Sequence, residues 1–378
     1  MKITFLAPCY CWGPSGGTRV VCEYSNRLVA KGHEVSIVFP RRLKYPPPPL
    51  AAEPLYYKLR GMARGAFEMF CKPSINWQPV DPRVKSLCVP SSDVSCVPDG
   101  DAIFATAWPT VRSVLEYPAA KGEKCYLIQG YETFMGPKDL VDETWRAPLH
   151  KVAVAKWLIE LGESLGCRDI AYVPNAINHE RYRLIEPIEG RRPRIAMAFS
   201  KAAVKGSSDG IEALEIVRKK YPGLRVVFFG TTNFRPSIPK WIEYHSNPPQ
   251  EFIIQEIYNK SSIFLSPSRS EGWSLPPAES AACGCAIVAS DSGGIRDYVE
   301  NGVTGMLSPS KDPKTLAENL CLLLAKDDLR IQLALAARKR VAEFSWDRSA
   351  SLLEGLLLNV IRRRQVATPL HSFARQAG

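Results

Sequence analysis

Residues 2–39, KITFLAPCYCWGPSGGTRVVCEYSNRLVAKGHEVSIVF, contain the pattern that decides the fold class. The apolar run at 2–8 ends in proline, which is typical of a strand buried on both faces of a sheet. A glycine-rich loop follows, and apolar residues then recur at helical spacing until Gly32, where we expect the helix to end. A second apolar run at 34–39 completes a strand, helix and strand. This unit predicts a doubly wound α/β domain.

The same alternation continues along the chain and restarts once. Residues 181–193 are polar and basic and are predicted to form a linker. Beyond it, strand-like runs again alternate with helical segments, which indicates a second parallel sheet. The strand-like runs lie at 102–106, 124–129, 169–174, 194–200, 224–230, 241–246, 262–268, 286–290 and 305–309. We therefore expect two Rossmann-like domains, at 1–180 and 194–345, whose carboxyl strand ends bind ligands.

Composition bounds the class of protein. The chain has 378 residues, of which 46% are hydrophobic, enough for two buried cores. It contains no run of eighteen apolar residues and no recognisable signal peptide, so we expect a cytoplasmic protein. Its 11 cysteines are an odd, scattered set, which indicates reduced thiols and neither a disulfide framework nor a metal site.

The net charge of +11 indicates an anionic partner, which could be a nucleic acid, a membrane surface or a phosphorylated small molecule. Residues 41–85 carry much of this charge. Within them, 55–70 read as an amphipathic helix with Lys58, Arg60 and Arg64 at or beyond the edge of its apolar face. Such a helix can rest on anionic lipid, or it can pack on its own domain, and both interpretations stay open.

Three loops that follow predicted strands contain glycines or lysines. Gly16 and Gly17 begin the first helix, where glycine lets the backbone approach an anion or simply turn tightly. The G-x-G-x-x-G spacing of NAD-binding proteins is absent there. Lys201 and Lys205 suit a leaving diphosphate, or they are solvated surface lysines. The Gly-Gly pair at 293–294 can bind the same diphosphate or serve only as a turn.

Two acids flank a predicted helix start in EGWSLPPAESAACG, residues 271–284. Glu271 is expected in the exit loop of a strand, the two prolines suit the first helical turn, Glu279 lies just inside the helix and Gly284 ends it. Carboxylates placed there can accept hydrogen bonds from the vicinal hydroxyls of sugar and ribose rings. A favourable interaction with the helix dipole explains the presence of Glu279 near the helix N-terminus equally well. It does not explain Glu271, which lies beside Gly272 in the loop.

Residues 268–307, SRSEGWSLPPAESAACGCAIVASDSGGIRDYVENGVTGML, with their Glu-x7-Glu motif, resemble glycosyltransferase family 4, retaining enzymes of the GT-B fold. The resemblance extends to Lys205 with Gly206, to Gly16 with Gly17, to VPNAIN at 173–178 and to FSW at 344–346. It implies two nucleotide-binding domains that face a cleft, and a C-terminal helix within 346–378 that returns to the first domain.

The resemblance also implies roles for individual residues. Glu271 and the amides after it would hold the donor sugar, Glu279 the nucleotide ribose, and Lys205 with its basic neighbour the diphosphate. The predicted catalytic residues are Lys201, Lys205 and Glu271. The predicted donor-binding residues are Gly16, Gly17, Gly272, Trp273, Ser274, Leu275 and Glu279.

The sequence departs from the family pattern in three places. Lys201 stands where an arginine is usual, so a compact ammonium group replaces a planar guanidinium group that can donate two parallel hydrogen bonds. EGWSL replaces the common EGFGL, which puts Trp273 and Ser274 near the predicted sugar site. The expected donor-binding histidine is missing from LIQGYETF at 127–134, where Gln129, Tyr131 or Glu132 can substitute. Tyr131 and Glu132 are the predicted acceptor contacts, although Glu132 can equally cap a helix.

The resulting prediction is a retaining glycosyltransferase that needs no metal or cofactor. It would move a sugar from a UDP-, GDP- or dTDP-linked donor to a glycan or lipid-linked acceptor, in cell-surface polysaccharide or glycolipid synthesis. We expect it to lie in the cytoplasm, on the inner face of the membrane, without a nucleic-acid partner. A sugar-nucleotide epimerase of the same fold is one alternative, and a nonspecific polyanion-binding protein, suggested by charge alone, is another.

Overall fold

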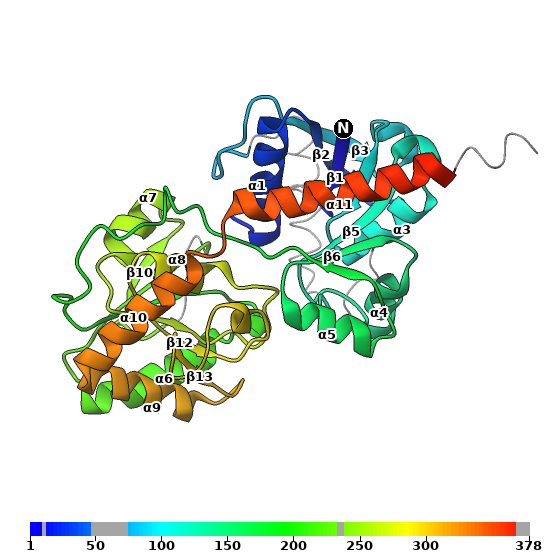
Figure 1. Cartoon of the computed structure of the whole chain (residues 1–378). Helices are drawn as coiled ribbons and strands as arrows, with labels where there is room; N and C mark the ends of the chain where they lie inside the picture. Colours follow the sequence, from blue (N-terminus) through cyan, green and yellow to red (C-terminus); the bar gives the residue numbers. More distant parts are fainter. Residues whose placement is uncertain (10–12, 47–74, 233–237, 368–378) are drawn as a thin grey trace, which may run out of the picture. The chain divides into compact units, whose positions relative to one another are not determined.

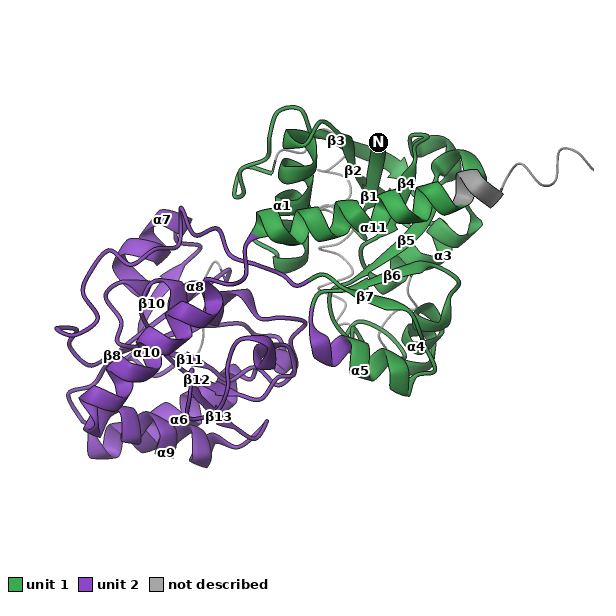
Figure 2. Ribbon diagram, in the orientation of Figure 1, with its two compact units in different colours: residues 1–154, 159–173, 346–378 green, residues 155–158, 174–345 purple. Residues whose placement is uncertain are grey.

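The computed structural model describes residues 1–9, 13–46, 75–232 and 238–367. They form two compact units, coloured separately in Figure 2. The first unit comprises 1–154, 159–173 and 346–378, and the second comprises 155–158 and 174–345. Lys58, Arg60 and Arg64 lie outside the described residues, so the predicted membrane-binding helix stays a prediction. Within the described ranges, no helix combines the length and apolar character needed to cross a bilayer.

The first unit is built on a parallel sheet of seven described strands in the order β3-β2-β1-β4-β5-β6-β7 (Figure 1). The strands are β1 (Lys2–Leu6), β2 (Glu34–Arg42), β3 (Lys85–Ser91), β4 (Ala102–Ala105), β5 (Glu123–Ile128), β6 (His150–Ala153) and β7 (Ile170–Tyr172). Its helices include α1 (Gly16–Ala30), α3 (Trp108–Glu116), α4 (Lys138–Arg146) and the part of α5 (Lys156–Ser164) that begins at residue 159. The reversal of strand order beside β1 confirms the predicted doubly wound fold.

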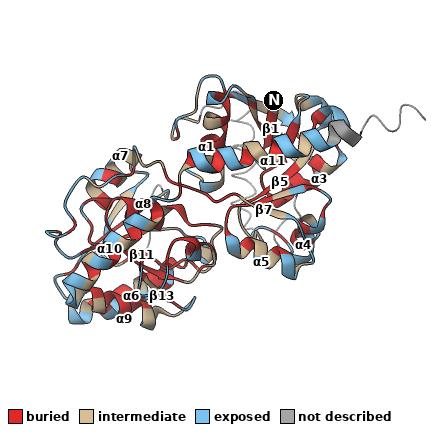
Figure 3. Cartoon of the chain, in the orientation of Figure 1, coloured by how far each residue is buried: buried red, intermediate tan, exposed pale blue. Residues whose placement is uncertain are grey.

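The second unit has a parallel sheet of six described strands in the order β10-β9-β8-β11-β12-β13. The strands are β8 (Arg194–Ala198), β9 (Arg225–Gly230), β10 (Glu243–Ser246), β11 (Ile263–Ser266), β12 (Ala286–Ser290) and β13 (Met306–Ser308). Helices α6 (Ser207–Lys220), α7 (Gln250–Phe252), α8 (Leu275–Ala282), α9 (Pro313–Ala325) and α10 (Asp327–Val341) surround it, and a π-helix spans Ile253–Tyr258. Strand residues such as Met197, Phe228 and Leu265 are fully buried in its core. Figure 3 colours the backbone of both units by burial.

Residues 181–193, predicted as a linker, pack against the second unit. Ile188 belongs to the core of that unit. The buried Arg191 guanidinium donates hydrogen bonds to the carbonyls of Ser261 at 3.0 Å and Cys283 at 2.8 Å. Buried carbonyl groups need hydrogen-bond donors, and Arg191 supplies them here. In the sequence, the same arginine contributed to the basic character that suggested a linker. Residues 174–193 accordingly belong to the second unit, and the first unit resumes only at Trp346.

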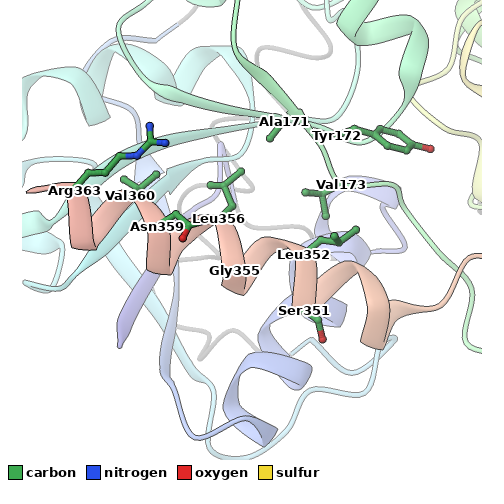
Figure 4. A pocket seen from close by; sticks show the side chains of 10 residues that line it. All are labelled: Ala171, Tyr172, Val173, Ser351, Leu352, Gly355, Leu356, Asn359, Val360 and Arg363. Carbon is green, nitrogen blue, oxygen red and sulfur yellow. The ribbon is translucent and has the colours of Figure 1, made fainter.

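The last described helix, α11 (Trp346–Ala367), packs on the first unit against α1 (Figure 1). The Trp346 and Tyr24 rings meet edge to face at 5.5 Å between centroids. The Glu354 carboxylate accepts a hydrogen bond from Lys31 at 2.8 Å and lies 2.8 Å from His33 Nε2. These contacts confirm the expected return of the C-terminal helix. Between α11 and β7 lies a cavity of about 530 Å³, shown in Figure 4.

We predict that Glu354→Gln loosens α11 from α1 in a pH-dependent manner. Hydrogen bonds, chiefly from Lys31 and then from His33, hold the pKa of Glu354 below its usual range. The carboxylate therefore stabilises the fold above its unfolded pKa of about 4.3, and this contribution is lost as pH falls through the folded pKa. We expect a loss of about 0.5–1 kcal/mol at pH 7.

Urea unfolding from pH 7 to pH 3 measures this effect. Glu163→Gln is the matched control, because Glu163 is exposed on α5 of the same unit. A constant difference between wild type and Glu354→Gln at every pH would contradict the assignment.

Candidate functional site

Three loops of the second unit meet at the carboxyl edge of its sheet, because the strands that they follow are neighbouring and parallel. The loops are residues 199–206 after β8, 267–274 after β11 and 291–294 after β12. β11 pairs in parallel with both β8 and β12. Such an edge is where open α/β sheets bind ligands, and it carries most of the predicted catalytic and donor-binding residues.

The structure brings two predicted catalytic residues, Lys205 and Glu271, into direct contact. Lys205 Nζ lies 2.8 Å from Oε1 and 2.9 Å from Oε2 of Glu271. The Lys205 side chain is 40% exposed and that of Glu271 is 13% exposed. Lys201 lies in the same loop, is exposed, and has no ion pair among the described residues. The edge therefore presents Lys205 beside a carboxylate and Lys201 elsewhere in the same loop, groups suited to phosphate and to hydroxyls.

Gly206 holds the Lys205 loop against the loop after β11. It adopts a left-handed conformation (φ 59°, ψ 23°) at the start of α6, and a Cβ there would lie 2.0 Å from the Pro267 carbonyl oxygen. Only glycine meets both constraints without strain. The Val204 carbonyl accepts a hydrogen bond from Arg269 N at 2.8 Å, which joins the same two loops.

Arg269 and Asp209 form a bidentate ion pair that our sequence analysis missed. Arg269 Nε lies 2.8 Å from Oδ2 and Nη2 lies 2.7 Å from Oδ1 of Asp209. The hydrogen bonds from Arg269 lower the pKa of Asp209. The pair fastens the loop before Glu271 to the first turn of α6. The arginine two residues before Glu271 was the available signal, but its partner is distant in sequence.

Gly293 and Gly294, in the loop after β12, hold that loop against Glu271. Glu271 N donates to the Ser292 carbonyl at 3.0 Å, and Gly294 N donates to the Glu271 carbonyl at 3.3 Å. A Cβ on Gly294 would lie 2.1 Å from the Gly272 carbonyl oxygen, and Gly293 has a φ of 82°. Gly294 is therefore needed for close backbone approach and Gly293 for its positive φ, whichever ligand role they have.

The residues after Glu271 contribute mainly backbone atoms to this edge. The Gly272 carbonyl accepts a hydrogen bond from Trp157 Nε1 at 2.9 Å. The Trp273 side chain is 1% exposed and packs on Tyr298, with ring centroids 4.8 Å apart. Our sequence analysis placed Trp273 near a sugar, but its indole lies in the core. Ser274 has a φ of 70°, a conformation that favours the glycine common at this position in EGFGL.

Helix α8 begins at Leu275 and confirms the predicted helix start. The two prolines lie in its first turn, and Gly284 follows its end with a φ of 92°. Glu279 lies on this helix and is buried, and its carboxylate accepts a hydrogen bond from the Tyr258 hydroxyl at 3.2 Å. The carboxylate is therefore held by the core of the unit.

In the first unit, the predicted glycines lie at the carboxyl end of β1, where Gly16 begins α1. A Cβ on Gly17 would lie 3.4 Å from Gln129 Nε2, which donates to the Thr106 carbonyl at 3.0 Å. Gln129 Oε1 and Trp108 Nε1 are buried without a hydrogen-bond partner in the part of the chain that is described. Gly17 therefore lies against the side chain of Gln129 in the first unit.

Tyr131 and Glu132, the two residues predicted to contact the acceptor, both form hydrogen bonds within the first unit. The Tyr131 hydroxyl donates to Asp142 at 2.7 Å. Glu132 accepts a hydrogen bond from Trp108 N at 2.8 Å and so caps α3, as its alternative interpretation proposed. Desolvation raises the pKa of Glu132 to about 7, although the Trp108 hydrogen bond opposes the shift. A carboxyl group with this pKa can exchange a proton near neutral pH.

Comparison with known proteins finds a family model that is similar to part of the second unit. Residues 179–340 match glycosyl transferases group 1. A D-inositol 3-phosphate glycosyltransferase of Xylanimonas cellulosilytica is 29% identical over 196 residues, covering 49% of this chain and 46% of that protein. The same enzyme of Corynebacterium jeikeium is 37% identical over 109 residues, covering 29% of this chain and 26% of that protein. The chain therefore matches less than half the length of these relatives.

Solved structures share the fold over nearly the whole chain. Sucrose-phosphate synthase from Thermosynechococcus elongatus aligns with a TM-score of 0.68 at 15% identity, covering 96% of this chain and 99% of that one. Anabaena Alr3699/HepE, solved with UDP and glucose, aligns with a TM-score of 0.68 at 14% identity, covering 95% and 100%. S. aureus TarM aligns with a TM-score of 0.70 at 11% identity, covering 95% and 98%. The expected GT-B fold is confirmed.

We predict that Gly206→Ala destabilises the second unit by at least about 2 kcal/mol, because alanine meets both an unfavourable φ and the Pro267 carbonyl. Gly223→Ala is the control, since a Cβ there has no neighbour within 4 Å and its φ is ordinary. Chemical denaturation measures both. Equal stability of the two variants would show that the loops can separate without cost.

We also predict that Glu132→Gln removes a pH dependence of stability. Because the pKa of Glu132 is raised to about 7, the folded state holds its proton more tightly than the unfolded state. Wild type should therefore lose on the order of 2 kcal/mol relative to Glu132→Gln between pH 5 and pH 8. Glutamine still accepts the Trp108 hydrogen bond. Denaturation curves at several pH values test this, and a pH-independent difference would refute the raised pKa.

Proposed function

We propose that the chain, whose residues 179–340 match glycosyl transferases group 1, is a retaining glycosyltransferase that uses a nucleoside-diphosphate sugar. The contact between Lys205 and Glu271 at the carboxyl edge of the second sheet is the observation that carries this proposal. It places a half-exposed cation beside a carboxylate in a loop that glycines hold in place.

In the proposed complex, side chains of opposite charge bind different parts of the donor. Lys205 and Lys201 would hold the diphosphate, whose negative charge repels carboxylates. Glu271 would accept hydrogen bonds from the sugar hydroxyls, and Glu279 from the ribose. When the donor binds, Lys205 exchanges its carboxylate partner for phosphate oxygens, so its charge remains compensated. The backbone of Gly272, Ser274 and Leu275 would complete the sugar site, and Gly16 and Gly17 would approach the diphosphate from the first unit.

The proposed reaction needs no protein nucleophile. The acceptor hydroxyl attacks the anomeric carbon from the face that the leaving diphosphate vacates. The bond from that carbon to the phosphate oxygen breaks, the bond to the acceptor oxygen forms, and the acceptor proton passes to a phosphate oxygen of the leaving group. Lys205 and Lys201 would stabilise the charge that develops on the diphosphate, and the remaining contacts would orient the two substrates.

We further propose a UDP-, GDP- or dTDP-linked donor and a glycan or lipid-linked acceptor. The UDP and glucose bound by Alr3699/HepE and the inositol phosphate in the names of the relatives support a nucleotide donor and a hydroxyl-rich acceptor. Tyr131 and Glu132 are the proposed acceptor contacts, in synthesis of a cell-surface polysaccharide or glycolipid. The basic segment around Lys58, Arg60 and Arg64 supports a location on the inner face of the membrane.

We predict that Lys205→Ala lowers kcat about 100-fold or more, because the lysine stabilises charge that develops only as the diphosphate leaves. Donors are first identified by thermal shift with UDP, GDP, dTDP and their sugars, since a ligand at a hundred times its Kd adds about 2.7 kcal/mol. Lys219→Ala, an exposed lysine of α6, is the control and should retain full turnover.

Unchanged turnover of Lys205→Ala at saturating donor would refute the proposed role of the lysine. The acceptor dependence of the reaction tests the class of enzyme. A transferase releases nucleoside diphosphate in proportion to added acceptor, whereas an epimerase converts the donor without one.

A further inference from the structure

A cavity of about 560 Å³ lies at the amino edge of the second sheet. Arg194, Arg225 and Glu243, the first residues of β8, β9 and β10, line it. The strands are parallel, so this edge is opposite the one that carries Lys205 and Glu271. The cavity is therefore separate from the proposed donor site. Its charged lining residues are Arg191, Arg192, Arg194, Arg225, Lys260, Glu186, Glu243 and Glu256.

Two arginines of the cavity lie side by side. Arg194 and Arg225 are register partners on adjacent parallel strands. Like charges at such positions repel each other unless an anion lies between them. Burial, opposed by Glu243 and reinforced by Arg225, lowers the pKa of the Arg194 guanidinium. The buried Arg194 guanidinium is thus close to a second positive charge, on the exposed Arg225.

Two of the three acids that line the cavity, Glu243 and Glu256, already form ion pairs. Glu256 pairs with Lys260 at 2.7 Å, and Glu243 pairs with His245 at 2.7 Å, while its other oxygen lies 3.4 Å from Arg194 Nη2. Arg192 and Arg225 are exposed and make no ion pair within the described ranges. The cavity therefore keeps more positive charge than its acids compensate.

The two buried arginines add to this excess. Arg191 donates hydrogen bonds to main-chain carbonyls, including those of Tyr258 and Cys283, but no carboxylate pairs with it in the described part of the structure. Arg194 Nε is buried and has no hydrogen-bond partner there. A buried cation without an anion and a buried N–H without an acceptor are both unfavourable. A bound anion in the cavity would compensate the positive charge of these arginines.

We propose that this cavity binds the phosphate monoester of a small polyhydroxylated molecule, such as a sugar phosphate. The planar guanidinium groups of Arg194, Arg225 and Arg192 match the geometry of phosphate oxygens. The exposed Glu186 carboxylate at the rim accepts hydrogen bonds from hydroxyls. The volume lies in the range of small-molecule sites. Gly190, where a Cβ would meet nothing within 4 Å, leaves the wall open.

The cavity wall is connected to the helix that carries Glu279. Arg191 Nη2 donates to the carbonyl of Cys283, directly after α8, at 2.8 Å. Its Nη1 donates to the Tyr258 carbonyl at 3.3 Å, and the Tyr258 hydroxyl donates to Glu279. A ligand that contacts Arg191 therefore acts on a group that holds the end of α8.

Calorimetric titration with glucose 6-phosphate and with inorganic phosphate tests the proposal. It is carried out in a Lys205→Ala background, which suppresses phosphate binding at the proposed donor site. We expect Arg192→Ala/Arg225→Ala to weaken glucose 6-phosphate binding at least about tenfold, because two charged hydrogen-bond donors are lost. Arg338→Ala/Lys339→Ala removes two exposed cations of α10 in the same unit and should leave the affinity unchanged.

Three results would overturn the proposal. The first is absence of glucose 6-phosphate binding in the Lys205→Ala protein. The second is an equal loss of affinity in the cavity variant and the α10 variant, which indicates nonspecific attraction to a basic surface. The third is inorganic phosphate binding as tightly as glucose 6-phosphate, which excludes recognition of the polyhydroxylated part. The arginines and the lysine changed in the two double variants are exposed, so thermal unfolding should show that these variants are as stable as the Lys205→Ala protein.

Discussion

The close approach of backbone to backbone at two glycines is the constraint on which the candidate site depends. Gly206 lies against the Pro267 carbonyl, and Gly294 lies against the Gly272 carbonyl. A parallel sheet brings the loops to one edge, but it does not set the distances between them. The two glycines do so, because any side chain at either position would separate the loops and move Lys205 away from Glu271.

The proposed donor would explain why a chain of net charge +11 keeps acids at its candidate site. A sugar nucleotide carries both negative phosphates and neutral hydroxyls, and no single charge type binds both well. Lys205 and Glu271 compensate each other across 2.8 Å when no phosphate is present. The pair therefore avoids the cost of isolated buried charge while it supplies one partner for each part of the proposed donor.

The second sheet carries positive charge at both of its edges, but in different forms. At the carboxyl edge, the cations are lysines in loops, beside a carboxylate. At the amino edge, the cations are arginines at the starts of strands and in the segment before β8, and two of them are buried. A flexible lysine suits the proposed diphosphate, which must bind and leave. The planar guanidinium group of arginine suits the proposed phosphate monoester, because it donates two parallel hydrogen bonds.

The sequence by itself determined the two α/β units, the strand and helix start around residues 271–284, and the loops that hold Lys205, Glu271 and the glycine pairs. These features follow from local periodicity and from residues with restricted backbone conformations. Only the tertiary structure decided that Trp273 is a core residue, that Arg191 caps carbonyls instead of marking a linker, and that Arg269 pairs with Asp209. Each of these depends on a partner far away in the chain, and composition and spacing carry no information about which distant groups a fold brings within hydrogen-bonding distance.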